Sequence, residues 1–318
     1  MKVLIFGAGG VGSVVGGFLA RTGHEVSLLG RPWHIDAVRK SGLTITGIWG
    51  DYRIKACDLY TSVDEVKKSA TRFDLIVLTV KSYDTAAAVD SIATLMSEQT
   101  MVLSLQNGLG NIEAILSRIP RESFLAGRLI FGVETTPGVA KVTVNADSVF
   151  IGALPGVQTR LSAHRMATTL SDAKIPTKAV PNILTYIWSK VIYNCALNAI
   201  CTIHEMPYGK ILENEYTRTQ MRAVVRECYA VGAAEGIVLE PKTADEYIEL
   251  LEKNLIPKTA QHYPSMLQDL MKGKRMDIAS LNGAIIDLGQ KKNVPTPVNQ
   301  ELVSVLLKKA PTSTPNSI

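Results

Sequence analysis

A glycine-rich loop joins a short apolar run to a helical pattern near the N-terminus. Residues 2–6 (KVLIF) have the pattern of a buried strand, GAGGVG follows, and residues 11–21 have the pattern of a helix. In such a unit the first glycine permits a tight turn, the second lets the backbone approach a pyrophosphate, and the third lets helix and strand pack closely. The pattern therefore predicts a dinucleotide-binding unit of Rossmann type. We expect the cofactor to contact Gly7, Ala8, Gly9, Gly10, Val11 and Gly12.

A second predicted strand, residues 25–29, ends in Gly30-Arg31. An acidic residue here would bind the ribose 2′-hydroxyl of NAD and repel a 2′-phosphate, whereas a guanidinium binds a phosphate through paired hydrogen bonds. No acidic residue is adjacent to Arg31 in the sequence. The position predicts NADPH rather than NADH as the cofactor. The alternative is that Arg31 is a solvated loop residue.

Two further apolar runs, residues 73–80 and 101–105, have the composition of strands buried on both faces of a parallel sheet. Lys81 follows the first run and Asn107 follows the second. Because ligands bind at the carboxyl ends of strands in open α/β sheets, both residues are candidates for the cofactor and substrate crevice. The alternatives are a surface lysine and a turn asparagine before glycine.

The remainder of the N-terminal half predicts the outer part of the same sheet. Between residues 123 and 152 the runs are shorter and richer in β-branched residues, which indicates antiparallel edge strands. A helix over 157–173 and a strand over 176–179 complete the pattern, and Pro176 and Pro181 bracket the predicted hinge. We therefore expect an NADP-binding domain over residues 1–180.

Strand signals nearly vanish after residue 183. The pattern predicts an all-α domain over residues 181–318 and a disordered tail over 311–318. The fold class is thus α/β, with a Rossmann-type domain followed by an all-α domain. The predicted helices include 188–200, 213–235, 244–254, 261–271, 276–291 and 299–309.

Three polar residues interrupt the otherwise apolar helix over residues 188–200. Lys190, Asn194 and Asn198 are spaced by four residues, so they lie on one face of the helix. Buried polar groups need partners, because leaving one unpaired costs several kcal/mol by order of magnitude, roughly 2–7. The partners are either other protein groups, in a structural network, or a polar ligand.

Two more polar residues stand at predicted helix starts. Ser265 begins the run SMLQD, and Asp277 begins the run DIAS. The serine hydroxyl either caps its helix or binds an anionic ligand. An aspartate in a first turn ordinarily stabilises the helix dipole, so Asp277 carries no functional signal by itself.

Composition limits the partners of the chain. The 318 residues have 46% hydrophobic and 20% charged side chains and a formal net charge of +5, and Lys and Arg are scattered rather than clustered with aromatic residues. This pattern does not favour nucleic-acid binding. The four cysteines lack metal-ligand spacing and resemble reduced core residues, and no signal peptide or membrane span is evident, so we expect a cytoplasmic protein without a metal site.

Together these motifs resemble the 2-dehydropantoate 2-reductase family, also called ketopantoate reductases. The resemblance covers nearly the whole chain, and the motifs occur in the family's order. It rests on GAGGVG at 7–12, Arg31, VKSYDT at 80–85, LQNGLG at 105–110, the W-x-K-x-x-x-N-x-x-x-N helix at 188–198, SMLQD at 265–269 and Leu281-Asn282-Gly283.

The resemblance implies NADPH-dependent reduction of 2-dehydropantoate to pantoate, on the route to pantothenate and coenzyme A. It implies that Lys190 is the general acid and that Asn107 lies near both nicotinamide and substrate. Arg31 and Lys81 match contacts to the adenosine end of the cofactor. The remaining positions match substrate contacts: Asn194 and Asn198 hold the substrate, Ser265 contacts its carboxylate, and Asp277 corresponds to the family's acidic residue.

Two positions depart from the family pattern. Asp277 stands where the family has glutamate, and Tyr208-Gly209 stands where an Asn-Gly pair often follows the catalytic helix. These changes leave open a related reductase of another branched 2-oxo acid. A non-catalytic NADPH sensor would not need Lys190. We expect a small-molecule 2-oxo acid as the partner, and no nucleic acid or membrane. The sequence leaves open a homodimer or a monomer.

Overall fold

The computed structural model describes residues 1–55, 57–145, 147–159 and 161–309 and divides into two compact units. Met1–Gln106 and Asn111–Ile183 form the first unit. The second unit contains the described chain from Leu184 to Lys309 together with the loop Asn107–Gly110. The first unit is a Rossmann-type α/β unit and the second is all-α, which confirms the predicted fold class.

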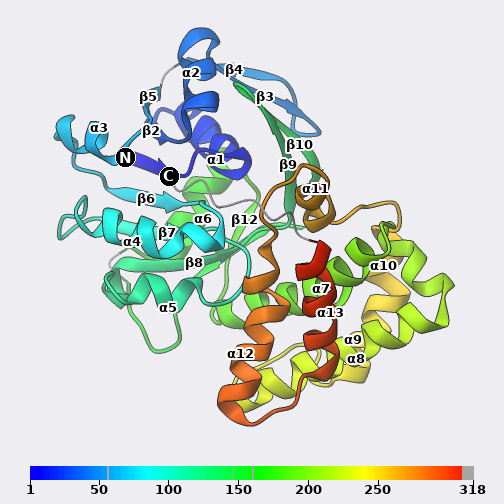
Figure 1. Ribbon diagram of the computed structural model, residues 1–318. Coiled ribbons are helices and arrows are strands. Elements are labelled where there is room, and N and C mark those ends of the chain that lie inside the picture. The colour runs from blue at the N-terminus through cyan, green and yellow to red at the C-terminus, as the bar shows by residue number, and fades with distance from the viewer. Residues whose placement is uncertain (56, 146, 160, 310–318) are drawn as a thin grey trace. The chain divides into compact units, whose positions relative to one another are not determined.

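The first unit is built on a mainly parallel sheet. Its central strands are completely buried because helices of the unit cover them, and strands buried on both faces have continuous apolar sequences such as LIVL and MVLS. Strands β6, β7 and β8 lie side by side in Figure 1. Among the described residues the strand order is β12(Thr177–Ala179), β11(Val149–Gly152), β8(Phe124–Arg128), β7(Met101–Ser104), β6(Leu75–Leu78), β1(Lys2–Phe6), β2(Glu25–Leu29) and β5(Cys57–Tyr60).

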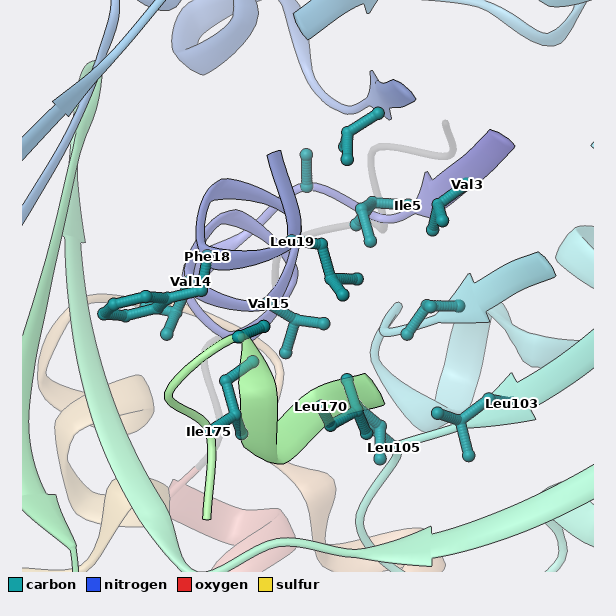
Figure 2. Close-up of a cluster of buried hydrophobic side chains, with 14 of the residues drawn as sticks. Val3, Ile5, Val14, Val15, Phe18, Leu19, Leu103, Leu105, Leu170 and Ile175 are labelled. Carbon is teal, nitrogen blue, oxygen red and sulfur yellow. The ribbon is translucent and has the colours of Figure 1, made fainter. Parts of the chain in front are cut away.

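Helix α1 (Gly10–Arg21) packs its apolar face against this sheet. Figure 2 shows Val15 and Leu19 of α1 gathered with Val3 and Ile5 of β1 in the core. Phe18 contacts the rings of two aromatic residues edge-on. The other helices of the unit are α2(Pro32–Ser41), α3(Val63–Lys68), η1(Ser82–Asp84), α4(Thr85–Ala93), α5(Asn111–Leu116), η2(Arg121–Ser123) and α6(Ala163–Asp172).

A second, four-stranded sheet corrects the prediction for residues 123–152. Strand β8 pairs parallel with β7, and the hairpin β9–β10 does not join the main sheet. Strand β10 pairs instead with β3, which pairs in turn with β4, and the sequence did not predict β3 or β4. Within the main sheet, β11 lies antiparallel to β8. The bounds of the second sheet are β3(Leu43–Gly47), β4(Tyr52–Ile54), β9(Phe131–Thr136) and β10(Val139–Asn145).

Small residues on α1 let this second sheet approach the helix closely. A Cβ at Gly10 would lie 2.6 Å from Oγ1 of Thr135 on β9, and a Cβ at Gly17 would lie 2.6 Å from Ile54 on β4. Neither distance leaves room for a side chain. Strand pairing between segments so far apart in sequence depends on this tertiary packing, so local patterns could not predict it.

The second unit surrounds helix α7 (Ile183–Ile203), which begins five residues before the predicted start at residue 188. Two long predicted helices are interrupted: residues 251–255 form a π-helical turn, and Leu281 leaves helical geometry. The predicted tail lies outside the described residues. The other elements are η3(Tyr208–Glu213), α8(Glu215–Ala234), α9(Ala244–Leu250), η4(Leu251–Leu255), α10(Ile256–Lys258), α11(Ser265–Met271), η5(Asp277–Ser280), α12(Asn282–Lys292) and α13(Pro297–Lys309).

A chain of hydrogen-bonded polar groups joins four helices of this unit. Glu227 of α8 accepts hydrogen bonds from the backbone N–H groups of Val298 and Asn299 at the start of α13. Asn282 of α12 donates to the side-chain oxygen of Asn299 (2.9 Å) and to the backbone carbonyl of Cys195 in α7 (3.2 Å). Asn282 and Asn299 are completely buried, so their hydrogen bonds help to fix α7 against α12 and α13.

The π-helical turn presents Glu252 to two arginines of α8. Arg218 and Arg222 each donate two hydrogen bonds to its carboxylate, at 2.5–3.2 Å. The bonds from Arg218, followed by those from Arg222, lower the pKa of Glu252 to about 2. This carboxylate therefore remains charged in the folded protein at acidities that protonate it in the unfolded chain.

We expect Glu252→Gln to lower the free energy of unfolding by about 1–3 kcal/mol at pH 7, because two charged partners lose their acceptor. The stabilisation is complete above the ordinary glutamate pKa of 4.5 and is lost as pH falls towards 2, so the difference from wild type shrinks over that interval. Urea titrations at several pH values measure it. Glu249→Gln removes an exposed partner of Lys253 and is the matched control. A difference that does not change with pH would contradict the assignment.

Candidate functional site

The glycine-rich loop is held between the ends of β2 and β6. The N–H groups of Gly7 and Ala8 donate to the carbonyl of Leu29 at 3.0 and 2.7 Å, and Oγ1 of Thr79 donates to the carbonyl of Gly7 at 2.8 Å. Gly7 has φ +106°, which disfavours other residues. A Cβ at Gly12 would lie 2.5 Å from the carbonyl oxygen of Gly7. The turn and the close packing expected of the first and third glycines are therefore present.

A buried histidine, His34, stabilises the glycine-rich loop through hydrogen bonds. Nδ1 of His34 accepts from the N–H of Gly138 (3.2 Å), so Nε2 carries the proton and donates to Oγ of Ser13 (2.9 Å). Ser13 in turn donates to the carbonyl of Ala8 (3.4 Å). Burial lowers the pKa of His34. The neutral ring thus connects α2, α1 and the β9–β10 turn to the glycine loop.

The first turn of α1 offers hydrogen-bond donors to an anion. Within the described chain, the N–H groups of Gly10, Val11 and Gly12 have no backbone acceptor, as the geometry of a helix start requires. A Cβ at Gly9 would meet only one neighbouring atom, at 4.0 Å, so the backbone there is open to a ligand. Free donors, an accessible backbone and the positive end of the helix dipole fit the pyrophosphate of a dinucleotide.

Arg31 follows β2 and Lys81 follows β6, the two strands that flank β1 in the sheet. Arg31 precedes α2 and is exposed, and Lys81 is exposed immediately before η1. The third residue of η1, Asp84, places its carboxylate 3.8 Å from the Arg31 guanidinium. The sequence showed no acid adjacent to Arg31, but the fold brings one there. Gln106 donates to the carbonyl of Val80 (3.0 Å), which connects the ends of β6 and β7.

In the second unit, the predicted helix face brings Lys190 to Asn107. The Lys190 ammonium donates a hydrogen bond to the side-chain oxygen of Asn107. Lys190 lies in the middle of α7 and is half-buried, less enclosed than the apolar sequence around it predicted. These two residues are 83 positions apart in the chain. The contact therefore depends on the loop Asn107–Gly110, which belongs to the helical unit.

The loop Asn107–Gly110 lies against η5. The N–H of Leu109 donates to the carbonyl of Ser280 at 2.8 Å, and a Cβ at Gly108 would lie 2.6 Å from that serine's side chain. Asp277 is the first residue of η5, is half-buried, and accepts from Oγ of Ser280 through its backbone carbonyl (3.0 Å). The loop that carries Asn107 is thus anchored to the short helix that carries Asp277.

The two asparagines of α7 differ in their partners. Asn198 is 4% exposed, and its side-chain oxygen accepts from the hydroxyl of Tyr208 at 2.6 Å. Asn194 is half-buried, and its side chain makes no hydrogen bond to any residue that the structure describes. Ser265 is exposed at the start of α11, where Pro264 is the capping residue and no side-chain cap forms. On this polar face, Lys190 and Asn198 have protein partners, as in a structural network. Asn194 has none among the described residues, as expected of a residue that contacts a ligand.

The described parts of the chain do not meet the requirements of a metal site, a membrane span or a disulfide. No three His, Cys, Asp or Glu side chains there are grouped as a metal ion would require. No helix among the described residues has the length and apolar character needed to cross a membrane. All four cysteines are free thiols; burial raises the pKa of Cys57 to about 11 and that of Cys201 to about 12.

A parallel sheet with a glycine loop at the N-terminus of α1 defines the class of dinucleotide-binding proteins, here joined to a helical unit with a lysine–asparagine pair. Two family models match the chain: Ketopantoate reductase PanE/ApbA over residues 3–156 and Ketopantoate reductase PanE/ApbA C terminal over 182–310. The chain belongs to the ketopantoate reductase family, a family of oxidoreductases.

Curated relatives and solved structures agree with this membership. The chain is 36% identical to the 2-dehydropantoate 2-reductase of Aquifex aeolicus, with 97% of each chain covered, and 36% identical to that of Pyrococcus horikoshii, with 94% of each covered. A PanE/ApbA family ketopantoate reductase from Ralstonia eutropha JMP134 has a TM-score of 0.86 at 32% identity. D-mandelate dehydrogenase with NADH and anilino(oxo)acetate has a TM-score of 0.87 at 29% identity. Both structures cover 97% of this chain, and the match spans 98% of each.

Sequence reasoning missed three residues that shape the site. Asp84 was part of a quoted motif but was not assigned to Arg31, and Ser280 gave no signal at all. Tyr208 was noted only as a lost polar contact, although its hydroxyl makes a new one. A buried tyrosine normally finds a hydrogen-bond acceptor, and that rule could have directed attention to the asparagines of α7.

Proposed function

We propose that the protein catalyses the NADPH-dependent reduction of 2-dehydropantoate to pantoate, a step towards pantothenate and coenzyme A, with Lys190 as the general acid. The observation that carries this proposal is the hydrogen bond between Lys190 and Asn107, beside an Asn194 side chain that has no partner among the described residues. Family membership and relatives named 2-dehydropantoate 2-reductase support it. A half-buried ammonium and an unsatisfied amide are the groups a polar 2-oxo acid needs.

The chemistry divides between cofactor and protein. When bound, the nicotinamide supplies a hydride to the carbonyl carbon of the substrate. Lys190 donates a proton from Nζ to the carbonyl oxygen, and its charge stabilises the negative charge that develops there. Asn107 orients the ammonium through its side-chain oxygen. Asn194 and Asn198 hold the substrate through amide N–H groups, Ser265 binds the carboxylate, and Asp277 accepts from the substrate hydroxyl.

The residues of the first unit fit NADPH. The free N–H groups at the start of α1 bind the pyrophosphate, Arg31 binds the 2′-phosphate, and Lys81 contacts the adenosine end. The similar structure of D-mandelate dehydrogenase holds NADH, so the choice between NADH and NADPH depends on the residues near the ribose. Arg31 favours NADPH, whereas Asp84 at 3.8 Å opposes the binding of a further negative charge.

A second candidate function is the reduction of another branched 2-oxo acid by the same chemistry. Asp277 is one methylene shorter than the family's glutamate, and Tyr208 replaces a frequent asparagine. The likeness to D-mandelate dehydrogenase, whose structure holds anilino(oxo)acetate, favours this alternative. In both cases the partner is a small molecule. We also propose a cytoplasmic location, since all four cysteines are free thiols.

Initial rates with a panel of 2-oxo acids test the function. NADPH oxidation would be followed by nicotinamide absorbance with 2-dehydropantoate and with branched and aryl-substituted 2-oxo acids. We expect kcat/KM for 2-dehydropantoate to exceed the others by at least about tenfold, because a pocket that hydrogen-bonds its substrate discriminates strongly. A preference for another acid would establish the second candidate. Tight NADPH binding without turnover of any acid would contradict both.

A further inference from the structure

Tyr208 and Asn198 form a buried hydrogen-bonded pair in the helical unit. Tyr208 begins η3 and is 4% exposed, as is Asn198 on α7. The phenol hydroxyl donates to Oδ1 of Asn198 at 2.6 Å, a short distance for an O–H···O bond. Ten residues separate the two in the chain, so the bond connects α7 to the segment that follows it.

The hydrogen bond distinguishes the oxygen Oδ1 of the Asn198 amide, which accepts from Tyr208, from the nitrogen Nδ2. Burial raises the pKa of Tyr208 well above its ordinary value, so the hydroxyl stays protonated and donates at any working pH. The bond therefore fills one of the two acceptor positions of Oδ1. Nδ2 has no hydrogen-bond partner within the part of the chain that the structure describes. The bond therefore fixes the orientation of the amide, and the N–H groups of Nδ2 are available to donate to a ligand.

The position of the Tyr208 ring does not depend on this hydroxyl. The ring contacts Tyr193 edge-on, with centroids 5.8 Å apart, and the ring of His262 at 5.2 Å. Its backbone N–H donates to the carbonyl of His262 at 3.0 Å. Phenylalanine at this position would keep the ring contacts and remove only the hydrogen bond to Asn198.

We propose that Tyr208 is a positioning residue that holds the Asn198 amide with Nδ2 towards the substrate, so that this position recognises an acceptor oxygen of the 2-oxo acid. The acceptor is a carboxylate, carbonyl or hydroxyl oxygen of the substrate. The inference rests on the proposed function, because it gives Asn198 a substrate to bind. It adds that a hydrogen bond from Tyr208 fixes the orientation of the Asn198 amide. The neighbouring Asn194 has no such partner among the described residues.

The first test compares Tyr208→Phe with the wild type, using the 2-oxo acid that the wild type reduces best. We expect KM for the acid to rise about 3- to 10-fold, the range for one lost hydrogen bond, with kcat within about twofold and KM for NADPH unchanged. Tyr229→Phe is the matched control, because it removes a hydroxyl that donates to the carbonyl of Pro241 (2.9 Å) elsewhere in the unit. We expect that variant to keep the wild-type KM.

A double-mutant cycle separates positioning from a structural role. Asn198→Ala should raise KM, and adding Tyr208→Phe to it should change KM by less than about twofold, because the group being positioned is gone. Asn198→Asp keeps an acceptor for Tyr208 but removes the donor, and we expect it to raise KM at least as much as Asn198→Ala. Additive effects on KM, or an unchanged KM in Tyr208→Phe, would overturn the inference while the proposed function stands. A wild type that reduces no 2-oxo acid would overturn both.

Discussion

Replacing Lys190 with alanine is expected to lower kcat at least about 10³-fold, with little change in the affinity for NADPH. General acid catalysis contributes about 10²–10⁴-fold, and loss of a charge beside the developing alkoxide adds to the defect. The N–H groups proposed to bind the pyrophosphate stand at the start of α1 in the other unit, so we do not expect cofactor binding to need the ammonium. Single-turnover rates and fluorescence titration with NADPH measure the two quantities separately.

Two further variants sharpen the test of Lys190. Lys190→Arg keeps the positive charge but cannot give up a proton near neutrality, so we expect it to recover less than about a tenth of the lost rate. Lys210→Ala removes an exposed lysine of the same unit, paired with Glu213, and should keep the wild-type rate. Full activity in Lys190→Arg would assign an electrostatic role alone, and retained turnover in Lys190→Ala would exclude any role in catalysis.

The second large effect is expected at Arg31. Arg31→Ala should weaken NADPH binding about 10- to 100-fold, the range for a charge-assisted bond to phosphate, and leave NADH binding within about threefold. The reason is that only NADPH carries the 2′-phosphate. Dissociation constants from fluorescence titration with both cofactors measure the ratio. Arg118→Ala removes an exposed arginine paired with Asp90 in the same unit and is the matched control.

Replacing the carboxylate near Arg31 is expected to change the affinity for NADPH in the opposite direction. Asp84 lies 3.8 Å from the guanidinium and contributes a negative charge where the phosphate is expected. Asp84→Asn should therefore improve the affinity for NADPH about 2- to 10-fold, more at low than at high ionic strength. Equal weakening of both cofactors in Arg31→Ala would mean that the arginine supports the loop and does not select the phosphate.

The polar face of α7 shows why a pattern alone left two interpretations open. Lys190 and Asn198 each bond to a protein group, as a structural network requires. Asn194 has no partner among the described residues, as a ligand contact requires. The helical period predicted which residues share a face, because side-chain direction repeats with the backbone geometry. It carried no information about what stands opposite that face.

The sequence by itself determined the local elements. The strand at Lys2–Phe6, the glycine loop and the helix after it were predicted nearly to the residue, because periodicity and glycine conformations act between near neighbours. The motif order identified the family, and the helical character of the second half followed from composition. The interruptions at Leu251 and Leu281 were not predicted, since tertiary packing overrides helix propensity there.

Only the tertiary structure decided which distant residues meet. It assigned the β9–β10 hairpin to a second sheet, brought Asp84 to Arg31, joined Lys190 to Asn107 and gave Asn198 a tyrosine partner. Several of these residue pairs are separated by tens of residues. Their contacts are fixed by how whole elements pack, for example by the glycines of α1 that admit the second sheet. Local patterns specify each element, whereas the site depends on close packing between elements.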